Sequence, residues 1–384
     1  MPDDAPIGRR LQVRELPSDG LAPTAKRPRE RQPNDGVDRT RAGRAFAVFL
    51  KIACWTNLAI VAGVWLLVRF LGESWYLTTA LLYLPRWPWL LPSIPLTLAA
   101  AWVWRRGLWL TLPAIALVAG PLCGLRLGWA GWTASALPQL SLVTVNIQNG
   151  QPNLRATLGE IERRGIELIC CQEVDSEQLE LIETAAAMGL ADQHYDSYFW
   201  TASSRPLTKI DVLESQASFR DIAAVYRIDD AEVGGRPVHL VNVHLSTARF
   251  GLKNLRPRTP LTGIGLDELA AAQSIRMTEI AELAALLARL AEEGEVVACG
   301  DFNMPTDSTA FAPLLEQYRS AFDTAGLGYG YTVPNDAGHG WPRGFCWLRV
   351  DHVLITDGLT PLSADEGDAA GSDHRAMFAT IGWD

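Results

Sequence analysis

The segment from residue 45 to residue 139 constrains the fold of this chain more than any other feature. It contains a single acidic residue, Glu73, together with ten of the fourteen tryptophans. A composition this poor in charge and this rich in tryptophan is typical of membrane-embedded helices. Three uncharged apolar runs within the segment are each close to the length that crosses a bilayer: 52–68, 87–104 and 107–125. The sequence therefore predicts a transmembrane region of about three helices over residues 45–126.

The hydrophobic core of a soluble helical domain is the alternative interpretation of this region. Prolines inside and beside the apolar runs favour the membrane, because neighbouring membrane helices satisfy the backbone groups that proline leaves free. These prolines are Pro88, Pro92, Pro95, Pro113 and Pro121.

Basic residues predict how the helices are oriented. Residues 1–44 hold six prolines and ten Lys or Arg, and we expect them to form a disordered tail. Arg105 and Arg106 separate the second and third apolar runs. Basic segments favour the cytoplasmic side, so three crossings place everything after residue 125 outside the cytoplasm. If one crossing fails, the same rule places that part in the cytoplasm.

After a linker over residues 127–139, strand and helix patterns alternate through residues 140–384. Short β-branched or alternating apolar runs predict strands, and amphipathic runs predict helices. The expected strands cover 140–147, 166–171, 222–228, 238–245, 348–355 and 377–381, and the expected helices cover 153–165 and 267–293. A segment of this length can build one α/β core from two sheets with helices outside them.

The tetrapeptide Gly300-Asp301-Phe302-Asn303 carries the strongest chemical signal. It follows the apolar run 296–299, which predicts a buried strand. The carboxylate of Asp301 and the amide of Asn303 are two residues apart, so on an extended chain they face the same side. Ser372-Asp373-His374 follows about seventy residues later. A carboxylate, an amide and a histidine oriented by a carboxylate are what metal-assisted phosphoester hydrolysis requires.

Polar residues also stand at the ends of the other predicted strands. The segments are Thr144-Val145-Asn146, Cys171-Gln172-Glu173-Val174, Val241-Asn242-Val243-His244-Leu245, Gly300-Asp301-Phe302-Asn303, Arg349-Val350-Asp351-His352 and Gly371-Ser372-Asp373-His374. In this order they resemble the motifs of the endonuclease/exonuclease/phosphatase family, and six motifs in order are far more specific than one. The resemblance covers residues 140–384 and implies a DNase I-like four-layer fold, a two-sheet β-sandwich flanked by helices. Together with the apolar region it implies a membrane-anchored bacterial type, integral to the plasma membrane.

The resemblance implies a metal site. Glu173 resembles the principal ligand of a divalent cation, Mg²⁺ or alternatively Mn²⁺, since such hard ions bind carboxylate and amide oxygens. Asn146 would assist at the metal or at a phosphate oxygen. Asp301 would orient the attacking water or hold a second metal, and Asp373 would support the metal.

The resemblance also implies the acid–base and substrate-binding groups. His374 resembles the general base or acid, with Asp351 fixing its tautomer and stabilising the imidazolium. Asn303 and His244 would donate hydrogen bonds to the non-bridging phosphate oxygens, and Arg220 would contact a substrate phosphate. Water would then attack in line, without a covalent enzyme intermediate.

Each of these residues also has a purely structural interpretation. Glu173 could cap a helix, His244 could lie in the core, and Asp301 with Asn303 could form an Asx-turn. Their joint occurrence at strand ends favours catalysis.

The net charge of residues 140–384 helps to distinguish between the candidate substrates. Residues 140–384 contain 35 acidic and 18 basic residues, a formal net charge of −17. Proteins that grip a duplex neutralise several phosphates with Lys and Arg, whereas the local basic cluster here is Arg249, Lys253, Arg256 and Arg258. The charge favours a small or lipid-borne phosphodiester or phosphomonoester over nucleic acid. A membrane-tethered endonuclease or exonuclease and a non-catalytic membrane scaffold with the same fold are the alternatives.

Overall fold

The computed structural model describes residues 35–128, 139–148, 154–175, 179–255, 262–335, 344–368 and 372–383. The chain divides into two units, with the boundary between residues 46 and 47 inside the first helix. The tail predicted to be disordered lies outside the described residues up to residue 34. From Asp35 the chain is helical, as the start of α1 (Asp35–Leu71), so the prediction of disorder is wrong for residues 35–44. A helix already nucleated in an apolar run extends readily into the polar residues beside it.

Two six-stranded sheets form the centre of the domain. The first sheet has the strand order β13 (Thr360–Glu366), β14 (Met377–Gly382), β2 (Gln139–Asn146), β3 (Leu168–Gln172), β5 (Phe199–Ser203), β4 (Asp192–Asp196). The second has the order β10 (Arg319–Ser320), β12 (Asp351–Ile355), β9 (Glu295–Asp301), β8 (Arg236–His244), β7 (Asp221–Val233), β6 (Leu207–Glu214). A short antiparallel pair joins β1 (Arg126–Leu127) to β11 (Leu327–Gly328).

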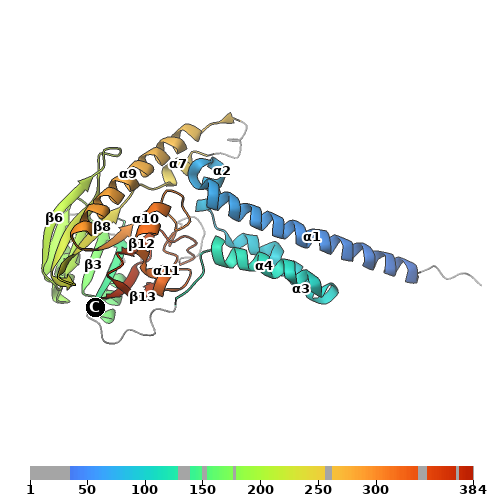
Figure 1. Ribbon diagram of the computed structural model, residues 1–384, viewed down its shortest axis with the longest axis horizontal. Coiled ribbons are helices and arrows are strands. Elements are labelled where there is room, and N and C mark those ends of the chain that lie inside the picture. The colour runs from blue at the N-terminus through green and yellow to red at the C-terminus, as the bar shows by residue number, and fades with distance from the viewer. Residues whose placement is uncertain are drawn as a thin grey trace, which may run out of the picture. The chain divides into compact units, whose positions relative to one another are not determined.

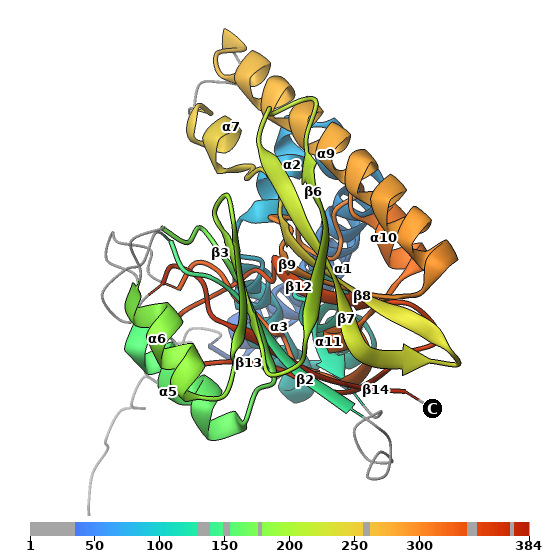
Figure 2. The same cartoon turned by 90° about the vertical axis from the view of Figure 1, so that its left-hand side faces the viewer.

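Helices cover the outer face of each sheet (Figures 1 and 2). Apolar side chains of α5 (Leu154–Arg164) and α6 (Leu179–Ala187) pack on the first sheet. Those of α9 (Leu266–Glu293) and α10 (Ala312–Gln317) pack on the second. A third apolar cluster fills the space between the two sheets. The order helix, sheet, sheet, helix confirms the predicted fold class, and the short helices α7 (Arg249–Lys253) and α11 (Ala321–Ala325) complete the domain.

The apolar N-terminal region contains α1, α2 (Tyr76–Tyr83), α3 (Leu90–Val103) and α4 (Leu108–Leu117). Leu50 of α1, Ala100 of α3 and Leu110 of α4 share one buried apolar cluster, and Val61 of α1 shares a second with Val118, the residue after α4. Among the described residues one helix, Arg41–Ser74, is long and apolar enough to span a bilayer, with a mean hydropathy of 1.8. The second and third predicted spans form shorter helices of 14 and 10 residues. The three-crossing topology therefore stays a prediction.

The segment between α1 and α3 is buried against the sheet domain. Glu73 is 2% exposed, and its Oε2 accepts hydrogen bonds from the backbone nitrogen of Thr309 at 3.1 Å and from its Oγ1 at 2.7 Å. Arg276 of α9 lies 3.6 Å from Oε1 of the same carboxylate. Further along, Arg86 donates to Asp307 at 2.5 Å. This segment, assigned to the membrane region on composition, is thus packed as part of the sheet domain.

Candidate active site

Strand register in the second sheet places three of the predicted site residues side by side. Strands β8 and β9 are parallel, with His244 opposite Asp301. Strands β9 and β12 are antiparallel, with Asp351 opposite the same Asp301. Residues directly opposite in a sheet direct their side chains to the same face. The three side chains therefore form a row across one end of this sheet.

The first sheet brings the remaining residues to the same place. In the parallel pair β2 and β3, Asn146 is opposite Gln172, and Glu173 follows directly with a left-handed φ of 53°. Ser372 fastens the loop before β14, because its Oγ donates to the Asn146 carbonyl at 2.6 Å and accepts from the His374 backbone nitrogen at 3.0 Å. His374 is thereby held at the end of β2.

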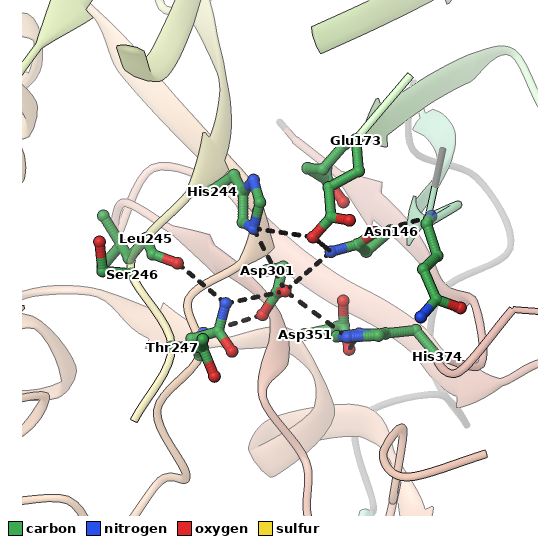
Figure 3. A network of polar contacts seen from close by, with 12 residues as sticks. Asn146, Glu173, His244, Leu245, Ser246, Thr247, Asp301, Asp351 and His374 are labelled. Carbon is green, nitrogen blue, oxygen red and sulfur yellow. Dashed lines mark hydrogen bonds and ion pairs between the residues drawn. The ribbon is translucent and has the colours of Figure 1, made fainter. Parts of the chain in front are cut away.

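Asp301 lies at the centre of the polar network in Figure 3 and is 1% exposed. Its Oδ2 accepts hydrogen bonds from Asn146 Nδ2 at 3.1 Å and from Asn303 Nδ2 at 3.0 Å. The same oxygen is 3.6 Å from His374 Nε2 and 3.8 Å from His244 Nε2. One carboxylate thus contacts groups from three other chain segments and from its own.

His374 and Asp351 form a buried hydrogen-bonded pair, with 2.9 Å between Nδ1 and Oδ2. The carboxylate fixes the proton on Nδ1 and leaves Nε2 facing Asp301. Burial lowers the pKa of His374, but the carboxylates of Asp351 and Asp301 outweigh burial and raise that pKa to about 10. Burial in turn raises the pKa of Asp301 above its usual range. At neutral pH the ring therefore holds a proton at Nε2, which faces Asp301 and can be given up in general acid catalysis.

The predicted substrate-binding residues Asn303, His244 and Arg220 line a cavity of about 490 Å³. Glu173 and His374 line it too. His244 Nε2 lies 3.5 Å from Glu173 Oε1, and burial lowers the pKa of His244 well below its usual value. Its neutral ring can donate or accept a hydrogen bond. Arg220 lines the cavity too, but its Nη2 donates to the His244 carbonyl at 2.5 Å. Arg220 therefore supports the end of β8 as well as facing the cavity.

The carboxylates of the cavity fit a divalent cation. Glu173 and Asp301 supply the hard oxygen ligands that Mg²⁺ prefers. Oδ1 of Asp351 is buried and, among the described residues, has no hydrogen-bond partner. Clustered buried carboxylates repel one another unless a positive charge offsets them. Asp301, Asp351 and His374 also have ligand atoms within 4.8 Å of one another. In that group, however, Asp351 and His374 are already hydrogen-bonded to each other. We therefore favour Glu173 and Asp301 as the residues that would hold the cation.

Two of the four predicted metal ligands make other contacts. Asn146 directs its amide nitrogen to Glu173 Oε1 at 2.9 Å, and its Oδ1 accepts from the backbone of Gln148 at 3.0 Å. Asp373 pairs with Arg249 at 3.1 Å. In this arrangement Asn146 orients the acidic ligands, and Asp373 lies beside His374 Nε2 at 4.0 Å.

Some residues that support the site were not predicted from the sequence. Behind it, Gln172 Nε2 of the first sheet donates to Asn242 Oδ1 of the second at 2.7 Å. Their positions at strand ends were a usable signal. Tyr83 of α2 donates to the Asn303 carbonyl at 3.3 Å across 220 residues of sequence. No local pattern in the sequence indicates that contact.

Taken together, the fold and the site define a class of protein: DNase I-like hydrolases, with an acidic site and a histidine–carboxylate pair where two sheets end. The chain matches the family model described as Endonuclease/Exonuclease/phosphatase family over residues 143–374. It belongs to this family, whose members in general hydrolyse phosphoesters and typically use a divalent metal. This confirms the resemblance found in the sequence.

The chain is similar to several solved structures at low sequence identity. One is an endonuclease/exonuclease/phosphatase from Bacteroides vulgatus, with 15% identity and a TM-score of 0.48 over 64% of this chain and 100% of that one. Another is a truncated TDP2 from Caenorhabditis elegans, with 19% identity and a TM-score of 0.45 over 64% of this chain and 98% of that one. No curated protein matches the chain.

Proposed function

We propose that the protein is a membrane-anchored, divalent-metal-dependent phosphoesterase that hydrolyses a small or lipid-borne phosphoester by in-line attack of water. The observation that carries this proposal is the approach of His374 Nε2 to within 3.6 Å of Asp301 Oδ2 while Nδ1 is held by Asp351 at 2.9 Å. A proton carrier and a cation-binding carboxylate are then within reach of one phosphoryl group.

Each side chain has a physical role in this reaction. Asp351 keeps the Nδ1 proton in place, so His374 Nε2 can take a proton from the attacking water or give one to the leaving oxygen. Asn303 and His244 face the cavity and can donate to non-bridging oxygens as negative charge builds on them. A divalent cation held by Glu173 and Asp301 would supply Lewis-acid stabilisation of that charge.

Exposed apolar side chains support the membrane anchor. Trp102 is 90% exposed, Trp109 82% and Phe70 71%, and they lie on or beside the apolar helices. Large exposed apolar surfaces of this kind mark contact with lipid or another protein. With the basic tail on the cytoplasmic side, the hydrolytic domain would lie outside the cytoplasm.

The test uses the full chain in lipid nanodiscs. It compares p-nitrophenyl phosphate, bis(p-nitrophenyl) phosphate and plasmid DNA, each with Mg²⁺, with Mn²⁺ and with EDTA. Metal-dependent release of p-nitrophenolate supports the proposal. Cleavage of the plasmid alone would favour the nuclease alternative, and no reaction with any substrate and either metal would favour the non-catalytic scaffold.

Replacing Glu173 by glutamine tests the cation site directly. The Mg²⁺ concentration for half-maximal activity should rise by about 10- to 100-fold or more, because even outer groups of a metal site contribute that much to affinity. Titration calorimetry with Mg²⁺ alone provides a readout that does not depend on turnover. Glu232→Gln is the matched control, since it makes the same change at an exposed position of β7. Equal Mg²⁺ affinity in the two variants would contradict the assignment.

A further inference from the structure

A second, largely apolar groove opens beside the catalytic cavity. It has a volume of about 340 Å³, and its apolar walls are Tyr83, Leu252, Val333, Pro334, Trp347, Leu348 and Val350. Four residues line both the groove and the catalytic cavity: Thr247, Arg249, Asn303 and His374. A molecule whose phosphoryl group meets His374 could therefore extend directly into this groove.

One wall of the groove includes a residue of α2. Tyr83 is the last residue of α2, which connects the end of α1 to the segment before α3. Trp347 Nε1 donates to the Tyr83 carbonyl at 3.1 Å, and Tyr83 itself contacts the Asn303 backbone. Tyr83 thus connects α2, which lies between the apolar helices α1 and α3 in the chain, to a residue of the catalytic cavity.

The groove also has polar and cationic lining residues. Arg249 and Lys253 of α7 line it together with Asn303 and His374. Cationic side chains beside apolar walls match the two halves of an amphiphile with a phosphate at its head.

We infer that this groove holds the alkyl chain of a membrane lipid whose phosphoester is hydrolysed at His374. The inference rests on the proposed function and narrows its substrate to an amphiphile. The alkyl chain would lie along the apolar walls of the groove while the phosphate meets Asn303 and His374, which line both the groove and the catalytic cavity. The alkyl chain contributes binding energy that a small phosphoester lacks. Each methylene group that moves from water into the groove strengthens binding about three- to fourfold.

The experiment uses the full chain in nanodiscs and a series of p-nitrophenyl alkyl phosphate diesters with methyl, butyl and octyl groups, each below the concentration at which it aggregates. We expect kcat/KM to rise at least tenfold from methyl to octyl. Leu252→Asp places a charge in the partly buried wall of the groove and should flatten this dependence. Leu252→Trp, which keeps the wall apolar but fills the groove, should shift the optimum to shorter chains.

Leu327→Asp is the matched control, because Leu327 is 74% exposed on β11 and lines neither cavity. It should keep the wild-type dependence on chain length. Equal hydrolysis of methyl and octyl esters by the wild type would overturn the inference and leave the phosphoesterase intact. Failure of the wild type to hydrolyse any of the esters with Mg²⁺ or Mn²⁺ would instead overturn the proposed function.

Discussion

Replacing His374 by alanine is expected to lower kcat by about 10²- to 10⁴-fold, the usual contribution of a positioned general acid or base. The expectation follows from the buried geometry of the ring, which donates from Nδ1 to Asp351 and presents Nε2 to the cavity. The loss should appear mainly in kcat, because the proton is transferred in the transition state. Steady-state kinetics with bis(p-nitrophenyl) phosphate would measure it.

Asp351 and His374 should behave as one unit. If so, Asp351→Asn combined with His374→Ala is no slower than His374→Ala alone, since groups that act together lose activity non-additively. His194→Ala is the control, because that imidazole pairs with Asp192 in β4, away from the cavity. A double variant whose losses simply multiply would show that the two residues act independently.

The second large effect concerns Glu73, the only acidic residue of the apolar region. Replacing it by alanine should lower the free energy of unfolding by about 3–5 kcal/mol, because the charge of Arg276 would remain buried without a carboxylate to offset it. Arg276 is itself 2% exposed, so water cannot readily replace the carboxylate. Chemical unfolding of the purified protein, followed by tryptophan fluorescence, would measure the change.

Two further variants isolate the buried pair. Replacing both members, Glu73→Leu with Arg276→Met, should recover much of the lost stability, because no uncompensated charge remains. Asp211→Ala breaks an ion pair with Arg289 that is half exposed, and should change stability by less than about 1 kcal/mol. An effect of Glu73→Ala as small as that of Asp211→Ala would show that the buried pair does not hold the segment between α1 and α3 against the sheet domain.

The fold and the position of the site were predictable where sequence and burial agree. Strand β9 is buried along its whole length, so its apolar run is unmistakable, and the polar residues after it must lie at a sheet end. The same reasoning located β2, β3 and β8 and therefore gathered the residues of the cavity. Their chemical roles stay predictions until the variants are measured.

Strands at the sheet edge and contacts between distant segments were not predictable. Strand β6 is mostly exposed, with Lys209 and Asp211 in its middle. An edge strand of this kind lacks the alternation of apolar and polar residues that identifies a half-buried strand. Nor does composition distinguish Glu73 from a charge at a membrane surface. Its buried role depends on Thr309 and Arg276, whose positions only the folded chain defines.

The contacts of Glu73 and Arg86 with the sheet domain have a consequence for how such an enzyme would meet its substrate. Because both residues bind the domain directly behind the apolar helices, the cavity would stay at a fixed height above the bilayer instead of sweeping through solution on a tether. Encounters would then occur by lateral diffusion in two dimensions. Turnover of a lipid would follow its mole fraction in the membrane and would fall when inert lipid dilutes the surface, even at constant bulk concentration.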